Sequence, residues 1–112
     1  MTSSAASGTD VSVVDHPEKS RFEAFLGGDR MGKADYRLSN TTLTFTHTEV
    51  DDAAEGKGVG SALARRALDS ARERGLRVVP QCEFIARYIA RHQDYLDLVD
   101  EDARHLVEAQ QD

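Results

Sequence analysis

A stretch with a glycine at every second position, Glu55-Gly56-Lys57-Gly58-Val59-Gly60-Ser61, has the composition of an anion-binding loop. Glycine lacks a Cβ atom, so the backbone can turn sharply there and a ligand can approach the main chain closely. A helix predicted to begin at about Gly60 or Ser61 would aim its first, unpaired N–H groups at the same place. Such a site suits a phosphate or pyrophosphate. The alternative interpretation is a solvated turn after a strand.

The spacing of the glycines excludes two common phosphate-binding motifs. A Walker loop requires Gly-Lys-Ser/Thr, whereas Lys57 is followed by Gly58. A dinucleotide fingerprint requires G-x-G-x-x-G, whereas Gly56, Gly58 and Gly60 give G-x-G-x-G. If the loop binds an anion, it therefore does so in another class of site.

Two ionisable side chains, His47 and Glu49, lie near the end of a predicted strand that leads into the loop. Alternation places them on one face together with Leu43 and Phe45. Residues two apart on a strand are separated by about 6 to 7 Å, so we expect a bridging water between His47 and Glu49 rather than a direct bond. His47 is a candidate base or proton relay that Glu49 orients. A structural, hydrogen-bonded histidine is the alternative.

Cys82 lies between a predicted short strand over 76–79 and a predicted helix over 84–92. A helix N-terminus favours the reactive thiolate, so Cys82 is a candidate acyl-accepting nucleophile. Its neighbour Glu83 opposes ionisation, and an inert, buried cysteine is the alternative. Pro80 lacks a backbone donor, so the strands beyond it are expected to splay and to open a slot beside His47 and Cys82.

The elements around these residues predict one α/β (α+β) domain with a mixed sheet. Alternation predicts strands over 21–26, 31–38 and 41–50 after a short strand at 11–14, which together form an antiparallel meander. A helix over 59–74, stopped by Gly75, then crosses over to the strand at 76–79, which makes the last two strands parallel. The second helix is expected to pack through Phe84, Ile85, Tyr88 and Ile89.

We expect the domain to cover residues 11–99. Residues 1–10 are predicted to be a disordered tail, and residues 100–112 an acidic tail that is a frayed helix or disordered.

The glycine loop and the strand before it resemble the acetyl-CoA loop of the GCN5-related N-acetyltransferases, whose signature is Gln/Arg-x-x-Gly-x-Gly/Ala. The matching residues are Thr46-His47-Thr48-Glu49-Val50 and Glu55-Gly56-Lys57-Gly58-Val59-Gly60-Ser61-Ala62-Leu63-Ala64. The stretches Leu76-Arg77-Val78-Val79-Pro80-Gln81-Cys82 and Tyr88-Ile89-Ala90-Arg91-His92-Gln93-Asp94-Tyr95 are similar to the short, single-domain, NATD1-like branch of that superfamily. The resemblance covers about Val13 to Val99. Glu55 occupies the Gln/Arg position, so no role of that side chain is carried over.

This resemblance implies a minimal acetyltransferase fold that moves an acetyl group from acetyl-CoA to an amine of a protein, a peptide or a small molecule. It implies that the pantetheine arm pairs with an exposed strand edge, and that Tyr88 is the acid toward the leaving thiolate in a direct transfer. The residues expected to hold acetyl-CoA are Val50, Gly56, Lys57, Gly58, Val59, Gly60 and Ser61. A non-catalytic acyl-CoA-binding or regulatory module, and a small structural domain, are the alternatives.

Composition bounds the remaining possibilities. A chain of 112 residues has room for one domain, and its 14 basic and 20 acidic residues give a net charge of −6. This charge disfavours a nucleic-acid partner and favours a cationic acceptor. Cys82 is the only cysteine, and no apolar run approaches the roughly 20 residues that span a bilayer, so we expect a cytoplasmic protein. We expect no metal site, and a monomer or a weak homodimer.

Overall fold

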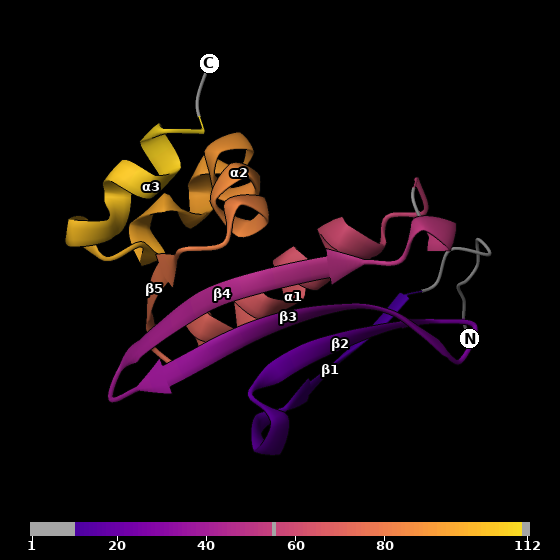
Figure 1. Ribbon diagram of the computed structural model, residues 1–112. Coiled ribbons are helices and arrows are strands. Elements are labelled where there is room, and N and C mark those ends of the chain that lie inside the picture. The colour runs from indigo at the N-terminus through magenta and orange to yellow at the C-terminus, as the bar shows by residue number, and fades with distance from the viewer. Residues whose placement is uncertain (1–10, 55, 111–112) are drawn as a thin grey trace.

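The computed structural model describes residues 11–54 and 56–110, which build a five-stranded mixed sheet (Figure 1). The predicted tail at 1–10 lies outside these residues. The strands are β1 (Val11–His16), β2 (Arg21–Leu26), β3 (Asp29–Ser39), β4 (Thr42–Val50) and β5 (Arg77–Pro80). They lie side by side in chain order. Neighbouring strands from β1 to β4 are antiparallel to one another, and β5 is parallel to β4. The predicted meander and parallel pair are confirmed.

Helices and short 3-10 turns connect and cover this sheet. The helices are α1 (Val59–Glu73), α2 (Glu83–Arg91) and α3 (Arg104–Glu108), and the 3-10 turns are η1 (Pro17–Lys19), η2 (Asp52–Ala54), η3 (Gln93–Leu98) and η4 (Glu101–Ala103). In α1, Gly75 ends the helix as predicted, with a φ of +68°, while the Leu76 N–H donates to the Ala71 carbonyl at 2.9 Å. Within residues 11–54 and 56–110, no helix is both long and apolar enough to cross a bilayer.

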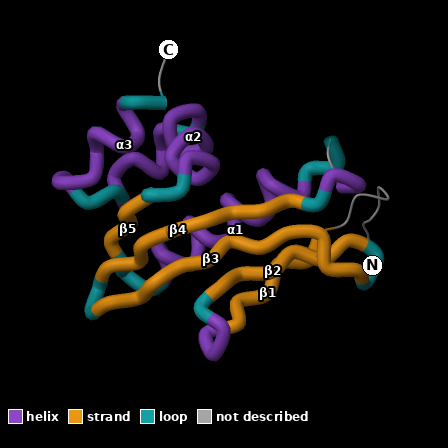
Figure 2. Tube along the Cα trace, viewed as in Figure 1, coloured by secondary structure: helices purple, strands orange, loops and turns teal. Residues whose placement is uncertain are grey.

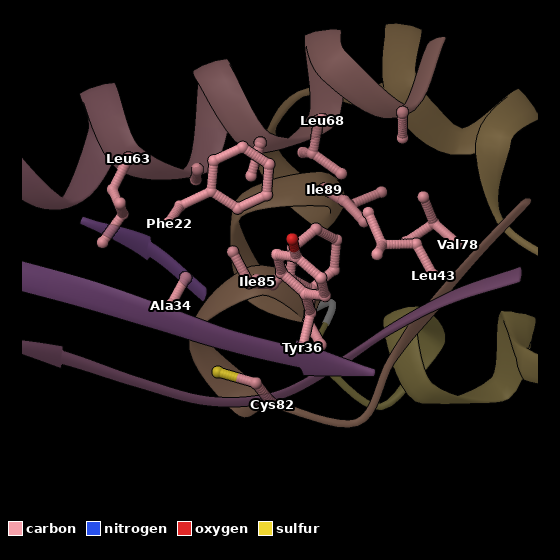
Figure 3. Packing of buried hydrophobic residues seen from close by; sticks show 14 of the residues in the cluster. Phe22, Ala34, Tyr36, Leu43, Leu63, Leu68, Val78, Cys82, Ile85 and Ile89 are labelled. Carbon is pink, nitrogen blue, oxygen red and sulfur yellow. The ribbon is translucent and has the colours of Figure 1, made fainter. Parts of the chain in front are cut away.

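The core lies between α1 and one face of the sheet. Leu63 and Leu68 of α1 point toward Phe22, Ala34 and Tyr36 of the strands, and all five side chains are buried (Figure 3). Helix α1 runs behind the sheet, while α2 and α3 gather beyond β5 (Figures 1 and 2). In the described part of the chain, the other face of β1–β4 carries no helix, and we call it the helix-free face.

The register between β3 and β4 shifts at one point, and this shift overturns one sequence prediction. Tyr36 pairs with Phe45 but Asp35 pairs with His47, so Thr46 is an extra residue in β4. An extra residue exchanges the two faces beyond it. Phe45 is fully buried, whereas His47 and Glu49 have 56% and 63% of their side chains exposed on the helix-free face. The prediction that His47 and Glu49 share a face with Leu43 and Phe45 is therefore wrong.

Residues 100–110 pack onto the domain and do not form a tail. Val99 forms an isolated parallel bridge with Val78, and η4 and α3 follow it beside α2 (Figure 1). Ala103 and Val107 are buried in the core. The predicted frayed or disordered tail is wrong for these residues, because Ala103 and Val107 are four apart and share one side of a helical turn, which leaves the carboxylates to solvent.

Candidate acyl-transfer site

The glycine loop has the backbone conformation of an anion cradle. Gly56 and Gly58 have φ angles of +81° and +79°, and a Cβ atom added to either would meet no atom within 4 Å. These glycines therefore serve the shape of the backbone rather than tight packing. Gly58 is the N-cap of α1, without a side-chain cap, and the helix begins at Val59, where the predicted apolar stripe of 59–74 begins.

The first turn of α1 leaves N–H donors at the positive end of the helix. The first intrahelical bond runs from the Ala62 N–H to the Gly58 carbonyl at 3.0 Å. The N–H groups that precede Ala62 in this turn have no partner inside the helix and face the loop. Lys57 is exposed beside them.

Gly60 has a different role from Gly56 and Gly58. A Cβ atom at Gly60 would lie 2.6 Å from Cζ of Phe84 and 3.5 Å from Cγ2 of Val50. Phe84, which the sequence pattern places in the packing stripe of α2, is 38% exposed and lies against the start of α1. Sequence reasoning missed Phe84 as a site residue, although the signature's demand for Gly or Ala at position 60 indicates that another group packs there.

A cleft opens where β5 ends and β4 continues. Phe45 and Pro80 form the last pair of β4 with β5, after which the Cys82 N–H donates to the Phe45 carbonyl at 2.9 Å. In the described residues no strand lies beside 46–50 on this side. The resulting space of about 400 Å³, which we call the β4 cleft, is lined by Thr46, His47, Thr48, Cys82, Phe84 and Arg87, among others. The predicted slot beside His47 and Cys82 is present, but it opens because β5 ends at Pro80 and not because two paired strands splay apart.

Cys82 lies in the β4 cleft at the N-cap of α2. It is buried, and its Sγ donates a hydrogen bond to Oγ1 of Thr48 at 3.0 Å. This partner is a neutral hydroxyl and not a general base such as histidine. Thr48 comes from β4 beyond the extra residue, so the shift that turns His47 outward turns Thr48 toward Cys82.

His47 and Glu49 form a direct pair on the helix-free face. His47 Nε2 lies 2.9 Å from Glu49 Oε2, so the predicted water bridge is wrong, because the two side chains lean toward each other along the strand. This hydrogen bond, with the Lys33 charge nearby, holds the pKa of Glu49 below its usual range. His47, Cys82 and Thr48 all line the β4 cleft. His47 reaches it from the helix-free face, and Cys82 and Thr48 reach it from the face that the helices cover.

Neighbouring β3 carries a matching pair. Lys33 Nζ lies 2.9 Å from Asp35 Oδ2. In the register of the two strands, Lys33 lies opposite Glu49 and Asp35 lies opposite His47. In residues 11–54 and 56–110, no three His, Cys, Asp or Glu side chains converge as metal ligands.

Tyr88 does not line the β4 cleft. It lies one turn beyond Phe84, where its ring stacks on His92 with centroids 4.0 Å apart. Burial raises its pKa. The structure thus brings His47, Glu49, Thr48 and Cys82 to one edge of the sheet and leaves Tyr88 outside this group.

The fold is that of an acetyltransferase family. Residues 21–98 match the family model described as GCN5-related N-acetyl-transferase, so the chain belongs to that family. It is 34% identical to protein NATD1 of Xenopus tropicalis over 79 residues, which cover 68% of this chain and 72% of the relative.

Two solved structures share the fold. A GCN5-like protein of Staphylococcus aureus superposes with a TM-score of 0.61 at 23% identity, over 85% of this chain and 91% of that one. The ribosomal-protein-S18-alanine N-acetyltransferase of Escherichia coli superposes with a TM-score of 0.51 at 21% identity, over 54% of this chain. The chain covers only 39% of the length of that enzyme.

Proposed function

We propose that this chain is an N-acetyltransferase that moves an acetyl group from acetyl-CoA to an amine. The observation that carries the proposal is the meeting of three features at one edge of β4. These are the uncapped start of α1 behind two left-handed glycines, the free strand edge at 46–50, and the β4 cleft with Cys82 and His47. Membership of the family supports acyl transfer.

The groups present fit acetyl-CoA. The open space above Gly56 and Gly58 and the N–H groups of the first turn of α1 suit the pyrophosphate, with Lys57 adding a charge at the rim. The free edge of 46–50 offers backbone groups to the amides of the pantetheine arm, as a sheet edge does to a peptide. Val50 and the ring of Phe84 supply apolar surface between these two places.

The chemistry follows from the two faces that meet at the β4 cleft. Cys82 and Thr48 lie where the thioester would be held, and His47 faces the open side from which an amine can approach. In this scheme His47 accepts a proton from the ammonium, and the neutral amine nitrogen then bonds to the thioester carbon. The carbon–sulfur bond breaks to release the CoA thiolate, which takes up the second proton that the nitrogen loses. Glu49 orients the imidazole and stabilises its protonated form.

A second candidate function is a non-catalytic acyl-CoA-binding module. The position of Tyr88 favours it, because the tyrosine that the family resemblance offers as an acid lies outside the β4 cleft. Both functions share the cofactor loop, and only transfer to an amine requires His47.

Calorimetric titration with acetyl-CoA, followed by mass spectrometry of CoA release and of added amines, tests the proposal. We expect saturable binding and amine-dependent release of CoA above the uncatalysed rate. Binding without release identifies the module, and absence of binding overturns both functions.

A further inference from the structure

A second hollow, of about 620 Å³, lies against the ends of β3 and β4 and adjoins the β4 cleft. Arg30 and Lys33 of β3 line it on one side, and Glu49, Asp51 and Asp52 line it on the other. We call this space the charged hollow. Thr48 lines both the charged hollow and the β4 cleft, and Glu49 of the hollow bonds His47 of the cleft. A molecule in the charged hollow would therefore lie beside the proposed base.

The β3 side of the charged hollow offers an available cation. Arg30 lies 3.6 Å from Glu23, but Glu23 is nearly buried and already has closer partners in Arg21 at 2.8 Å and His16 at 3.1 Å. Arg30 keeps 46% of its side chain exposed. As the most distant partner of an already satisfied carboxylate, Arg30 retains N–H donors for an external anion.

The β4 side of the charged hollow is acidic. Asp51 and Asp52 are exposed, and the hydrogen bond from His47 with the charge of Lys33 keeps the pKa of Glu49 low, so Glu49 is ionised at neutral pH. Three carboxylates here attract an ammonium group and bring it next to His47. The two sides of the hollow thus have opposite preferences.

We propose that the acceptor is a zwitterion, a primary amine that also carries a carboxylate or another anionic group, bound with its ammonium at Glu49 and its anion at Arg30. The proposal rests on the proposed function and names its substrate class. Arg30 and Lys33 pair with Phe25 and Glu23, which are two residues apart on β2 because Met31 is an extra residue in β3, so Arg30 lies about 7 Å along the sheet from Lys33, the residue opposite Glu49. A chain of several carbons between amine and anion fits this separation. A purely cationic acceptor would instead bring no anion to pair with Arg30.

Three six-carbon amines of equal length test the charge preference: 6-aminohexanoate, hexylamine and 1,6-diaminohexane. With the full chain and acetyl-CoA, we expect kcat/KM for 6-aminohexanoate to exceed that for each of the others by about tenfold, the scale of one charge-assisted pair. Arg30→Glu should reverse the order in favour of the diamine. Arg37→Glu is the matched control, since Arg37 is exposed on the same strand and does not line the charged hollow, and it should preserve the order.

Backbone amide NMR of the chain saturated with CoA separates the two proposals. We expect 6-aminohexanoate to shift the amides of 30–33 and 48–52, and hexylamine to leave them in place. Equal rates for the three amines, preference for the diamine, or absence of these shifts overturns the zwitterion proposal while acetyl transfer stands. If the proposed function fails, no amine causes release of CoA. The amide shifts then still show whether the charged hollow binds a zwitterion.

Discussion

The ring of Phe84 occupies the space that a side chain at Gly60 would fill, since a Cβ atom there would lie 2.6 Å from its Cζ. Through this contact α2 packs against the first turn of α1, and the same ring lines the β4 cleft. The clashing atom is the far end of a partly exposed side chain, so the ring can swing aside without unfolding the protein.

Gly60→Ala should therefore change binding more than stability. Alanine favours the helix by up to about 1 kcal/mol, so the thermal midpoint should be equal or higher, while the displaced ring weakens acetyl-CoA binding. Phe84→Ala should weaken binding by a similar amount, and the double variant should bind no worse than either single variant. Calorimetric affinities check this, and additive losses would contradict a shared cause.

Gly58→Ala tests the cradle against a matched glycine elsewhere. Gly58 and Gly28 both have φ near +80° to +90° and open space at the Cβ position, but Gly28 lies in the hairpin turn between β2 and β3. Each alanine should cost about 1 to 2 kcal/mol of unfolding free energy through the left-handed backbone. Only Gly58→Ala should also abolish acetyl-CoA binding. Urea unfolding and calorimetry measure the two effects, and wild-type affinity in a folded Gly58→Ala variant would refute the cradle.

His47→Gln should lower kcat by about 100-fold or more while acetyl-CoA affinity stays near wild type, because a base acts on the amine and not on the cofactor. His105→Gln, an exposed histidine on α3, is the control and should leave kcat unchanged. A wild-type rate for His47→Gln from about pH 6 to about pH 9 would return His47 to a structural role.

Cys82→Ala should keep transfer active, because the hydrogen-bond partner of the thiol is a hydroxyl rather than a general base and direct attack by the amine needs no acyl-cysteine. Wild-type protein incubated with acetyl-CoA and digested at low pH should show no acetylated Cys82 in mass spectra. An adduct that chases into the amine, with inactive Cys82→Ala, would establish the covalent route instead.

Val107→Ala should cost about 2 kcal/mol, because it removes fully buried methyl groups from the core. Glu108→Ala, one residue on and exposed, should change the unfolding free energy by less than about 0.5 kcal/mol. Urea unfolding curves give both values. Equal effects would mean that α3 does not contribute to the stability of the domain.

The parts of the fold that depend on local pattern follow from the sequence. Strands β2 and β3 alternate around a Gly27-Gly28 turn, and the apolar stripe of α1 ends at a glycine that the Schellman turn requires. The glycine loop is equally local, since φ angles and helix start come from neighbouring residues. These features need no knowledge of distant contacts.

The parts of the fold and of the site that depend on tertiary contacts do not follow from the sequence. The extra residue at Thr46 has no glycine or proline to mark it, because the bulge is set by pairing with β3, and it decides which face His47 occupies. Phe84 is an ordinary helix-stripe aromatic until α1 is placed beside it. The alternation of β2 places Glu23 among the surface residues, but its side chain is buried and contacts His16, Arg21 and Arg30. The residues next to it in the sequence do not indicate this burial.

Within residues 11–54 and 56–110 no strand pairs with the outer edge of β4 at 46–50, and this has a consequence for the protein in solution. Backbone donors and acceptors on an uncovered strand edge are a template for a strand of another molecule, so the same groups that would hold pantetheine can nucleate aggregation. A ligand bound along that edge competes with self-association for those groups. The supply of acyl-CoA would then set the solubility of the chain as well as its turnover, and protein purified without the thioester should be the more prone to precipitate.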